Sequence, residues 1–391
     1  MRVAFYAPMK PPDHPVPSGD REIARLLIRA LGAADHAVEI ASRFVSRDSR
    51  GDTVRQTRLR NLGGRLAARL VRRYRARPAD KRPQAWLTYH VYHKAPDWLG
   101  PAVADALGIP YLIVEASSAP KRAGGPWDIG YRGANAAIAR ADAVLTLNSD
   151  DIACLQPVID DSAWHRHLLP FVDADSYTAL TTWRGTIRST LARRCRWNPD
   201  IPWLLAVGMM RPGDKAASYD VLARAIFELT DEPWHLLVVG GGPQRPDIIR
   251  QLTAAAPGRV AFLGELSRDS LALVYAACDL FVWPAINEAF GMALLEAQAA
   301  GLPVVAGNQR GVPDIVSPGV TGLLPPAGDA AAFSDAVRRL LRDDALRRQF
   351  AEVAARRVRE KFDIAGAARE LDRALAMARL HADNRFVPGA A

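Results

Sequence analysis

The sequence predicts an α/β protein of two doubly wound domains, each with a parallel sheet covered by helices on both faces. Three observations support this prediction. Short apolar runs alternate with helical patterns along the first half of the chain, the same alternation restarts after residue 200, and the segment between lacks it. With 391 residues and a hydrophobic content of 49%, the chain can bury two cores.

The first half opens with an apolar run, a loop rich in proline and glycine (PMKPPDHPVPSGD) and a helical pattern (REIARLLIRAL). The runs that we expect to form strands lie at 2–7 (RVAFYA), 85–90 (AWLTYH), 109–117 (IPYLIVEAS) and 141–149 (ADAVLTLNS). Helical patterns follow at 98–107, at 130–140 and after residue 149. Strands that alternate with helices in this way favour a parallel sheet.

The second half repeats this order. Its expected strands are 203–208 (WLLAVG), 234–240 (WHLLVVG), 259–264 (RVAFLG), 279–284 (DLFVWP) and 302–307 (LPVVAG). We therefore expect an N-terminal domain over 1–180, a C-terminal domain over 200–362, and a helical tail over 363–391 that crosses back to the N-terminal domain. We expect the domains to face each other across a cleft, with ligands at the carboxyl ends of the strands.

The net charge of +9 is concentrated in one segment. Residues 43–82 hold 14 Lys or Arg and three acidic residues, and leucines recur there at helical spacing from Leu59 to Leu70. This pattern predicts a basic amphipathic helix, which either docks on its own domain or contacts an anionic membrane surface. No recognition motif accompanies the charge, so we expect no nucleic-acid partner.

No apolar run reaches the length of a membrane span, and MRVAFYAPMK does not resemble a signal peptide. The three cysteines are far apart and show no metal-ligand spacing. We expect a cytoplasmic protein, with peripheral contact to the inner face of the plasma membrane as the consequence of a membrane-binding helix.

The stretch NEAFGMALLEAQAAGLPVV places two glutamates, Glu288 and Glu296, around a predicted helix start at Gly291. Backbone N–H groups and the helix dipole at such a start favour an anion such as a diphosphate. Glu288 would then lie at one end of the diphosphate, near a sugar. Glu296, about 8 Å further along the helix, would accept hydrogen bonds from a ribose at the other end.

Residues 260–329 resemble the donor-binding half of family 4 glycosyltransferases of the GT-B fold, and a weaker resemblance extends over nearly the whole chain. It is carried by VAFLGELS, by LVYAACDLFVWPAINEAFGMALLEAQAAGLPVVAGNQRGVPDIV and by GVTGLLPPAGD. The resemblance implies that Glu288 contacts the transferred sugar and that Glu296 binds the ribose. It also implies that the segment of Phe290, Gly291 and Met292 supplies backbone donors.

The loop VGMMRPGDK (207–215) resembles the diphosphate clamp of the family, which contains an arginine and a lysine after a glycine. Lys215 matches the lysine and Gly208 the glycine. Met209 occupies the place of the arginine, so either Arg211 reaches the same phosphate or Lys215 acts alone. The resemblance also places Gly241, from GGGP, and Leu263 in the donor site.

In the N-terminal domain, Ser18-Gly19 resembles the glycine loop that approaches the donor phosphate and the acceptor. His90 matches a histidine that lies near the transferred sugar, with His93 as a competitor. Glu115 stands where many relatives carry histidine, which predicts a distinct acceptor site. Lys121 and Arg122 lie in a loop that either binds an acceptor phosphate or is simply mobile.

We therefore expect a retaining glycosyltransferase that moves a hexose from a UDP- or GDP-sugar to a saccharide or lipid-linked acceptor in the synthesis of a cell-surface polysaccharide or glycan. Its expected catalytic residues are His90, Glu288, Lys215 and Arg211. The resemblance implies no metal and no cofactor beyond the donor. The alternatives are a nucleotide-sugar epimerase, a sugar phosphorylase of the same architecture, or a non-catalytic sugar-nucleotide binder.

Overall fold

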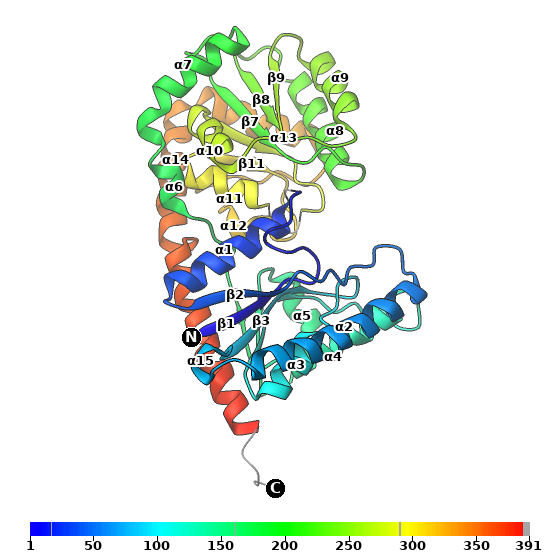
Figure 1. Ribbon diagram of the computed structural model, residues 1–391. Coiled ribbons are helices and arrows are strands. Elements are labelled where there is room, and N and C mark those ends of the chain that lie inside the picture. Colours follow the sequence, from blue (N-terminus) through cyan, green and yellow to red (C-terminus); the bar gives the residue numbers. More distant parts are fainter. Residues whose placement is uncertain (17, 161, 289–290, 386–391) are drawn as a thin grey trace. The chain divides into compact units, whose positions relative to one another are not determined.

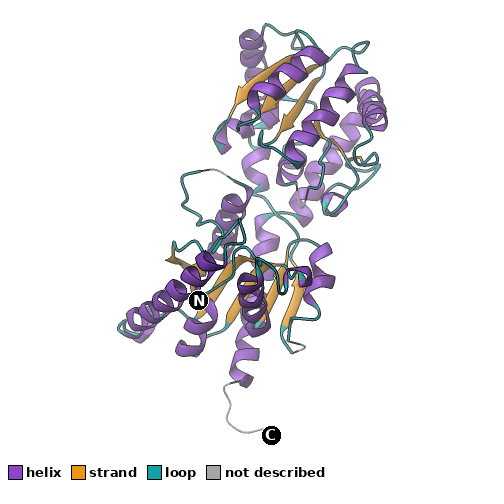
Figure 2. Ribbon diagram, turned by 90° about the vertical axis from the view of Figure 1, so that its right-hand side faces the viewer, coloured by secondary structure: helices purple, strands orange, loops and turns teal. Residues whose placement is uncertain are grey.

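The computed structural model describes residues 1–16, 18–160, 162–288 and 291–385 (Figure 1). The chain divides into two compact units, one of Met1–Leu169 with Ile364–Ala391 and one of Pro170–Asp363. Each unit contains a six-stranded parallel sheet with helices on both faces, as Figure 2 shows. The prediction of two doubly wound α/β domains is therefore confirmed.

The sheet of the first unit has the strand order β2-β1-β3-β4-β5-β6. Its strands are β1 (Arg2–Tyr6), β2 (Ala37–Ser42), β3 (Ala85–Val91), β4 (Tyr111–Ala116), β5 (Ala143–Thr146) and β6 (Trp164–His167). The central strands β1, β3, β4 and β5 are almost entirely buried, which is why they read as continuous apolar runs. The edge strands β2 and β6 are mostly half-exposed.

Two groups of helices cover the first sheet. One face carries α1 (Gly19–Ala33) and α15 (Ile364–Arg385), which pack on each other. The other carries α2 (Thr53–Arg75), α3 (Gly100–Leu107) and α4 (Asp128–Arg140). The remaining elements of the unit are short: α5 (Asp150–Leu155) and the 3-10 turns η1 (Ala79–Lys81) and η2 (Pro120–Arg122).

The second unit contains the strand order β12-β11-β10-β7-β8-β9. Its strands are β7 (Trp203–Val207), β8 (His235–Val239), β9 (Val260–Gly264), β10 (Leu280–Trp283), β11 (Val304–Ala306) and β12 (Gly322–Leu323). The order places β10 beside β7, so the loops that follow these two strands leave the same edge of the sheet.

Helices also cover both sides of the second sheet. Contacts join α8 (Asp214–Phe227) to α9 (Arg245–Ala255) and to α13 (Ala330–Arg342). A second group consists of α6 (Ala174–Thr178), α7 (Arg184–Cys195), α10 (Arg268–Ala277), α11 (Met292–Ala299) and α14 (Asp344–Lys361). The two remaining short elements are α12 (Val312–Ile315) and η3 (Thr181–Trp183).

The division between the units falls after Leu169, earlier in the chain than the expected end of the first domain at residue 180. Residues 174–178 form α6, which packs on α10, α11 and α14 of the second unit. Tyr177 in α6 is buried and stacks edge-on against Tyr275 of α10. The tail returns to the first unit, where α15 packs on α1 and on β4, β5 and β6.

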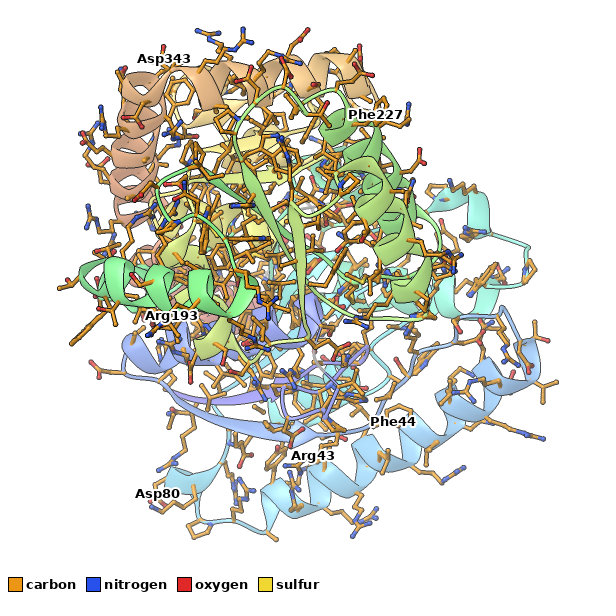
Figure 3. All side chains as sticks on the ribbon, turned by 90° about the horizontal axis from the view of Figure 1, so that it is seen from above. Arg43, Phe44, Asp80, Arg193, Phe227 and Asp343 are labelled. Atoms are coloured by element: carbon orange, nitrogen blue, oxygen red, sulfur yellow. The ribbon has the colours of Figure 1, made fainter. Side chains whose placement is uncertain are left out.

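The basic segment forms α2, a helix of 23 residues without an acidic residue (Figure 3). Asp52 caps its N-terminus by accepting a hydrogen bond from the backbone N–H of Arg55. Ala67, Leu70 and Tyr74 are buried against the first unit. No helix in the described part of the chain is both long enough and apolar enough to cross a membrane.

Candidate active site

The centre of the candidate site is a contact between the loop after β10 and the first turn of α8. Lys215 Nζ donates to the carboxylate of Glu288, and Trp283 Nε1 donates to the same carboxylate oxygen at 3.3 Å. The side chains of Lys215 and Glu288 are only 16% and 17% exposed. Half-buried charges need a partner, so in this state the two residues neutralise each other. A ligand that offers an anion and hydroxyl donors can replace both partners at once.

Two other elements hold the loop that presents Glu288. The backbone N–H of Ile286 donates to Ser218 Oγ of α8 at 3.0 Å. Asn287, with a left-handed φ of 51°, donates to Asp214 at 3.1 Å and accepts from Arg310 at 2.8 Å. The position of Glu288 is therefore fixed by side chains from α8 and from the loop after β11.

The helix α11 begins directly after Gly291, its N-cap, which has a φ of 69°. A Cβ at Gly291 would lie 2.6 Å from the Leu294 side chain, so both backbone conformation and space favour glycine. Met292 is the first residue of α11, and its N–H belongs to the unpaired first turn that favours an anion. Phe290, which the sequence also assigns to the donor site, lies outside the described residues.

Glu296 lies in α11 and is half-buried against two tyrosines. Tyr275 of α10 donates to Glu296 Oε2 at 3.0 Å. Burial, and next the charge of Glu296, raise the pKa of Tyr275 and that of Tyr177. Both phenols therefore remain protonated donors, which orients the carboxylate. The binding of a ribose by Glu296 stays a prediction.

The glycines after β7 and β8 have a structural reason. A Cβ at Gly208 would lie 2.6 Å from the indole of Trp283, and one at Gly240 would lie 1.9 Å from the carbonyl oxygen of Gly208. A Cβ at Gly241 would lie 2.6 Å from Glu265 Oε1. The two loops thus approach each other too closely for side chains. Gly208 leaves room for the indole of Trp283, which donates to Glu288.

Arg211 is the second cation of the predicted diphosphate clamp. Arg211 is exposed, and among the described residues it makes no hydrogen bond or ion pair. Met209, at the place of the expected arginine, is 39% exposed. Leu263 is half-buried in β9, the edge strand next to β8. The ligand contacts predicted for Arg211 and Leu263 stay predictions.

In the first unit, His90 lies at the end of β3 between two carboxylates. Its Nδ1 is 3.0 Å from Asp20 Oδ1 and 3.8 Å from Glu115 Oε2. Burial by itself would lower the pKa of His90, but the charge of Glu115 and the hydrogen bond to Asp20 raise it to about 9. The imidazole is therefore a cation at neutral pH and acts as a hydrogen-bond donor.

This charge bears on the role expected for His90. A protonated imidazole is suited to donate hydrogen bonds to ligand hydroxyls or to an anion. The catalytic role of His90 stays a prediction.

The predicted glycine loop forms the start of α1. Ser18 is the N-cap, and its side chain accepts from the backbone N–H of Arg21 at 3.3 Å. Apart from its two chain neighbours and the backbone of its own helix, no described atom lies within 4 Å of a Cβ placed on Gly19. Asp20, the next residue, is the partner of His90, so this loop and the end of β3 belong to one site.

The comparison with protein families concerns the second unit. Residues 201–343 match the family model of the group 1 glycosyl transferases. The match includes Lys215, Glu288, Gly291 and Glu296, the residues around which the site is built. Over this segment the second unit resembles the group 1 glycosyl transferases.

Curated relatives agree with this family match. A D-inositol 3-phosphate glycosyltransferase from Xylanimonas cellulosilytica is 32% identical over 231 residues, which are 58% of this chain and 54% of the relative. An N-acetyl-alpha-D-glucosaminyl L-malate synthase from Bacillus anthracis is 35% identical over 144 residues, 37% of each chain. The chain thus spans about half the length, or less, of these curated relatives.

Solved structures show the same fold at low identity. The structure of HepE from Anabaena in complex with UDP has a TM-score of 0.71 and 17% identity, and the match covers 96% of this chain and all of that one. At this identity the likeness shows the fold alone, which is the GT-B fold.

Some residues of the site carry no sequence signal that we used. Trp283 was read only as part of a buried strand, although its indole N–H contacts Glu288. Asp20 and Asn287 lie directly beside residues that we singled out, so a search of the neighbours of Gly19 and Glu288 would have found them. Tyr177 is separated from Glu296 by more than a hundred residues, and only the fold brings them together.

Proposed function

We propose that this chain is a retaining glycosyltransferase that moves a hexose from a nucleoside diphosphate sugar to an acceptor hydroxyl. The observation that carries the proposal is the half-buried pair of Lys215 and Glu288 beside the start of α11. A cation, a carboxylate and free helix amides match the leaving diphosphate and the hydroxyls of the transferred sugar.

On this proposal, donor binding exchanges one set of contacts for another. Lys215 leaves Glu288 for the diphosphate, whose charge also faces the first-turn amides of α11. Glu288 then accepts from hydroxyls of the sugar, and Glu296 accepts from the ribose. Arg211, exposed and unengaged in the described part of the chain, is available as a second cation for the phosphates.

The proton of the acceptor needs a destination once the bond to the anomeric carbon forms. We assign it to the departing diphosphate, on the face of the sugar from which the acceptor attacks. The bond between the anomeric carbon and the diphosphate oxygen breaks as the new glycosidic bond forms, and the anomeric configuration is retained. Lys215 and the amides near Gly291 stabilise the charge that builds on the leaving group.

Support for a nucleotide-sugar donor comes from the structural neighbours, since HepE was crystallised with UDP and with UDP-glucose. The names of the two relatives, which mention inositol 3-phosphate and L-malate, support transfer to small polar acceptors. For this chain, the identity of the donor nucleotide (UDP or GDP) and the identity of the acceptor remain part of the proposal.

The proposal is tested by incubating the full chain with UDP- and GDP-hexoses, with and without a panel of saccharide, sugar phosphate and lipid-linked acceptors. Release of nucleoside diphosphate that depends on the acceptor, together with an α-linked product from an α-linked donor, is the expected result. A donor altered without an acceptor would indicate an epimerase instead. Binding without turnover across the panel would indicate a non-catalytic binder.

We further propose that α2 contacts anionic membranes. Its outer surface carries exposed arginines and a partly exposed Leu62, while its inner surface is buried in the first unit. The exposed arginines are Arg55, Arg58, Arg60, Arg65, Arg69, Arg72, Arg73 and Arg75. Such a surface attracts anionic lipid head groups by about 1 kcal/mol for each cation near the membrane. This contact would place the chain at the inner face of the plasma membrane.

A further inference from the structure

A cluster of cations surrounds Trp127 in the first unit. Trp127 lies between the loop after β4 and α4. Lys94 Nζ lies 5.4 Å and Arg122 Cζ 4.9 Å from the centroid of its indole ring. The ring of His93 meets the indole edge-on at 6.1 Å. Groups from the loops after β3 and after β4 thus converge on one indole, at the carboxyl edge of the sheet.

The cluster contains buried polar atoms without partners. Among the described residues, neither ring nitrogen of His93 has a hydrogen-bond partner, and neither does Arg122 Nε, although all three atoms are inaccessible to solvent. An unsatisfied buried polar atom costs about 1–3 kcal/mol, so three of them in one place are unusual. A ligand with several acceptor oxygens would satisfy the Arg122 N–H and the one N–H that a neutral imidazole carries.

No negative charge of the described chain compensates the cluster. Lys94, Lys121 and Arg122 form no salt bridge with a described carboxylate. Burial first, and then the charges of Arg122, Lys94 and Lys121, lower the pKa of His93 to about 4. Burial and these three positive charges together keep the imidazole of His93 neutral at neutral pH.

Two acidic residues that border Trp127 are already engaged elsewhere. Asp48 accepts from the backbone N–H groups of Arg50 and Asp52 and from the Gln56 side chain. Asp128 accepts from the backbone N–H of Gly124 at 2.8 Å and pairs with Arg132 at 2.8 Å. The charge that the cluster lacks must therefore come from outside this part of the chain.

A row of rings connects the cluster to His90 within the first unit. The centroids of His90 and Tyr92 are 4.8 Å apart, and those of Tyr92 and His93 are 5.3 Å apart. His93 then contacts Trp127. A small molecule of about the length of a sugar can span this row, with a hydroxyl near His90 and a charged group at Trp127.

We propose that Lys94, Lys121, Arg122 and His93 form a binding site for a phosphate monoester, and that this phosphate belongs to the acceptor. The assignment to the acceptor rests on the proposed glycosyltransferase function, whereas the site itself does not. Arg122 and Lys121 donate to the phosphate oxygens, Lys94 adds charge, and His93 donates one N–H. A dianion suits the site because it meets three cations in a half-buried setting.

The test uses the full chain with isotopically labelled histidine and inorganic phosphate as the probe. His93 is assigned with a His93→Gln variant, and its ring resonances are followed by NMR. Phosphate should shift them saturably and should raise the pKa of His93 by at least about one unit, since a neighbouring dianion favours the imidazolium. A readout at His93 excludes any phosphate bound at Lys215 in the second unit.

Charge-removing variants test which cations bind. Arg122→Gln and Lys121→Gln should each weaken phosphate binding about tenfold, the effect of losing a charged hydrogen bond. Lys121 is exposed, so Lys121→Gln tests the site even where Arg122→Gln disturbs the fold. Lys81→Gln is the matched control, because Lys81 precedes β3 and so lies at the opposite edge of the same sheet. It should leave binding unchanged.

Two results would overturn the site: His93 resonances that do not respond to phosphate, or equal weakening by Lys81→Gln and Lys121→Gln. Vesicles that contain phosphatidic acid distinguish the source of the phosphate. Their displacement of inorganic phosphate assigns the site to a lipid acceptor, and no displacement assigns it to a soluble one.

A separate measurement tests whether the phosphate bound near His93 belongs to the acceptor. In the same samples, nucleoside diphosphate binding is followed through the second unit, and transfer to phosphorylated and unphosphorylated forms of one sugar is compared. If wild type and Lys121→Gln each transfer sugar equally well to the phosphorylated and the unphosphorylated form, the bound phosphate does not belong to the acceptor. The proposed function would remain intact. A chain that binds phosphate at His93 and transfers no sugar would refute the proposed function and leave the phosphate site intact.

Discussion

His90 and Glu115 occupy facing positions of β3 and β4 and share a left-handed backbone conformation, each with a φ of 65°. Their side chains approach to 3.8 Å. This conformation costs a non-glycine residue about 1–2 kcal/mol and persists only where its surroundings enforce it. Two such residues side by side at a strand end, with Asp20 as a third partner, are typical of a functional site.

The raised pKa of His90 predicts a pH dependence of stability. A histidine whose pKa rises on folding stabilises the native state below its unfolded pKa, and this contribution is lost as pH rises through the folded pKa. A rise from about 6.5 to about 9 corresponds to on the order of 3 kcal/mol as an upper bound. Wild type should therefore lose more stability than His90→Gln between pH 6.5 and pH 9, measured by denaturant unfolding.

His93 supplies the control for this measurement because its pKa moves in the opposite direction. With a pKa lowered to about 4, chiefly by burial, His93 stabilises the native state above pH 6.5, and that contribution is lost as pH falls toward 4. His93→Gln should thus change the acid limb of the stability profile and leave the interval from pH 6.5 to 9 as in wild type. Parallel profiles of wild type and His90→Gln in that interval would contradict the predicted charge of His90.

The sequence predicts the central strands and the edge strand β9, but it misses β2, β6 and β12 at the other sheet edges, for a physical reason. β3 and β4 are buried on both faces and so read as continuous apolar runs. β2 (AVEIAS) and β6 (WHRH) lie at the edges of their sheet, where half-exposed polar positions interrupt the apolar pattern. We predicted neither of them, and β12, only two residues long, has no pattern that a sequence can show.

The candidate site divides in a similar way. Glu288, Lys215 and Glu296 stand in motifs whose spacing can be recognised along the chain. The partners that set their geometry come from elements far apart in sequence, as Tyr177 does for Glu296 and Arg310 for the Glu288 loop. The charge state of His90 also depends on such a partner, since Asp20 lies 70 residues away. Contacts of this kind follow only from the fold.

Removal of the Glu288 carboxylate should separate turnover from binding. Glu288→Ala leaves Lys215 unpaired and free for a diphosphate, so the affinity for free nucleoside diphosphate should be unchanged or higher. Turnover should fall by about a hundredfold or more, as for other groups that act mainly in the transition state. Glu228→Ala, which removes an exposed acid at the far end of α8, is the matched control. Equal losses of binding and turnover in Glu288→Ala would contradict the assigned role.

The two cations after β7 should differ in their effects. Lys215→Gln leaves the half-buried Glu288 without its charge partner, which should cost both stability and turnover. Arg211→Gln removes an exposed side chain without a partner among the described residues, so stability should stay within about 0.5 kcal/mol of wild type. Thermal unfolding and transfer rates measure the two effects. A full loss of turnover in Lys215→Gln with none in Arg211→Gln would mean that Lys215 acts alone.

Gly208 should be intolerant of a side chain. A Cβ there would lie 2.6 Å from the indole of Trp283, whose N–H holds Glu288, so Gly208→Ala should destabilise the second unit by about 1–3 kcal/mol. It should also reduce transfer by displacing Trp283. Gly185→Ala in α7 is the control, because no atom lies within 4 Å of its Cβ position. An unchanged melting temperature and rate for Gly208→Ala would show that Trp283 can move without consequence.

The surface of α2 predicts binding to anionic vesicles that depends on charge and on salt. Arg65, Arg69 and Arg72 are exposed, and no acidic residue of α2 offsets them. Reversal of all three to glutamate should abolish co-sedimentation with vesicles rich in phosphatidylserine, and added salt should weaken the binding of wild type. A matched reversal of the exposed arginines Arg348, Arg356 and Arg359 on α14 should reduce binding much less. If both triple variants sediment like wild type, the surface of α2 serves only to keep the helix solvated on its own unit.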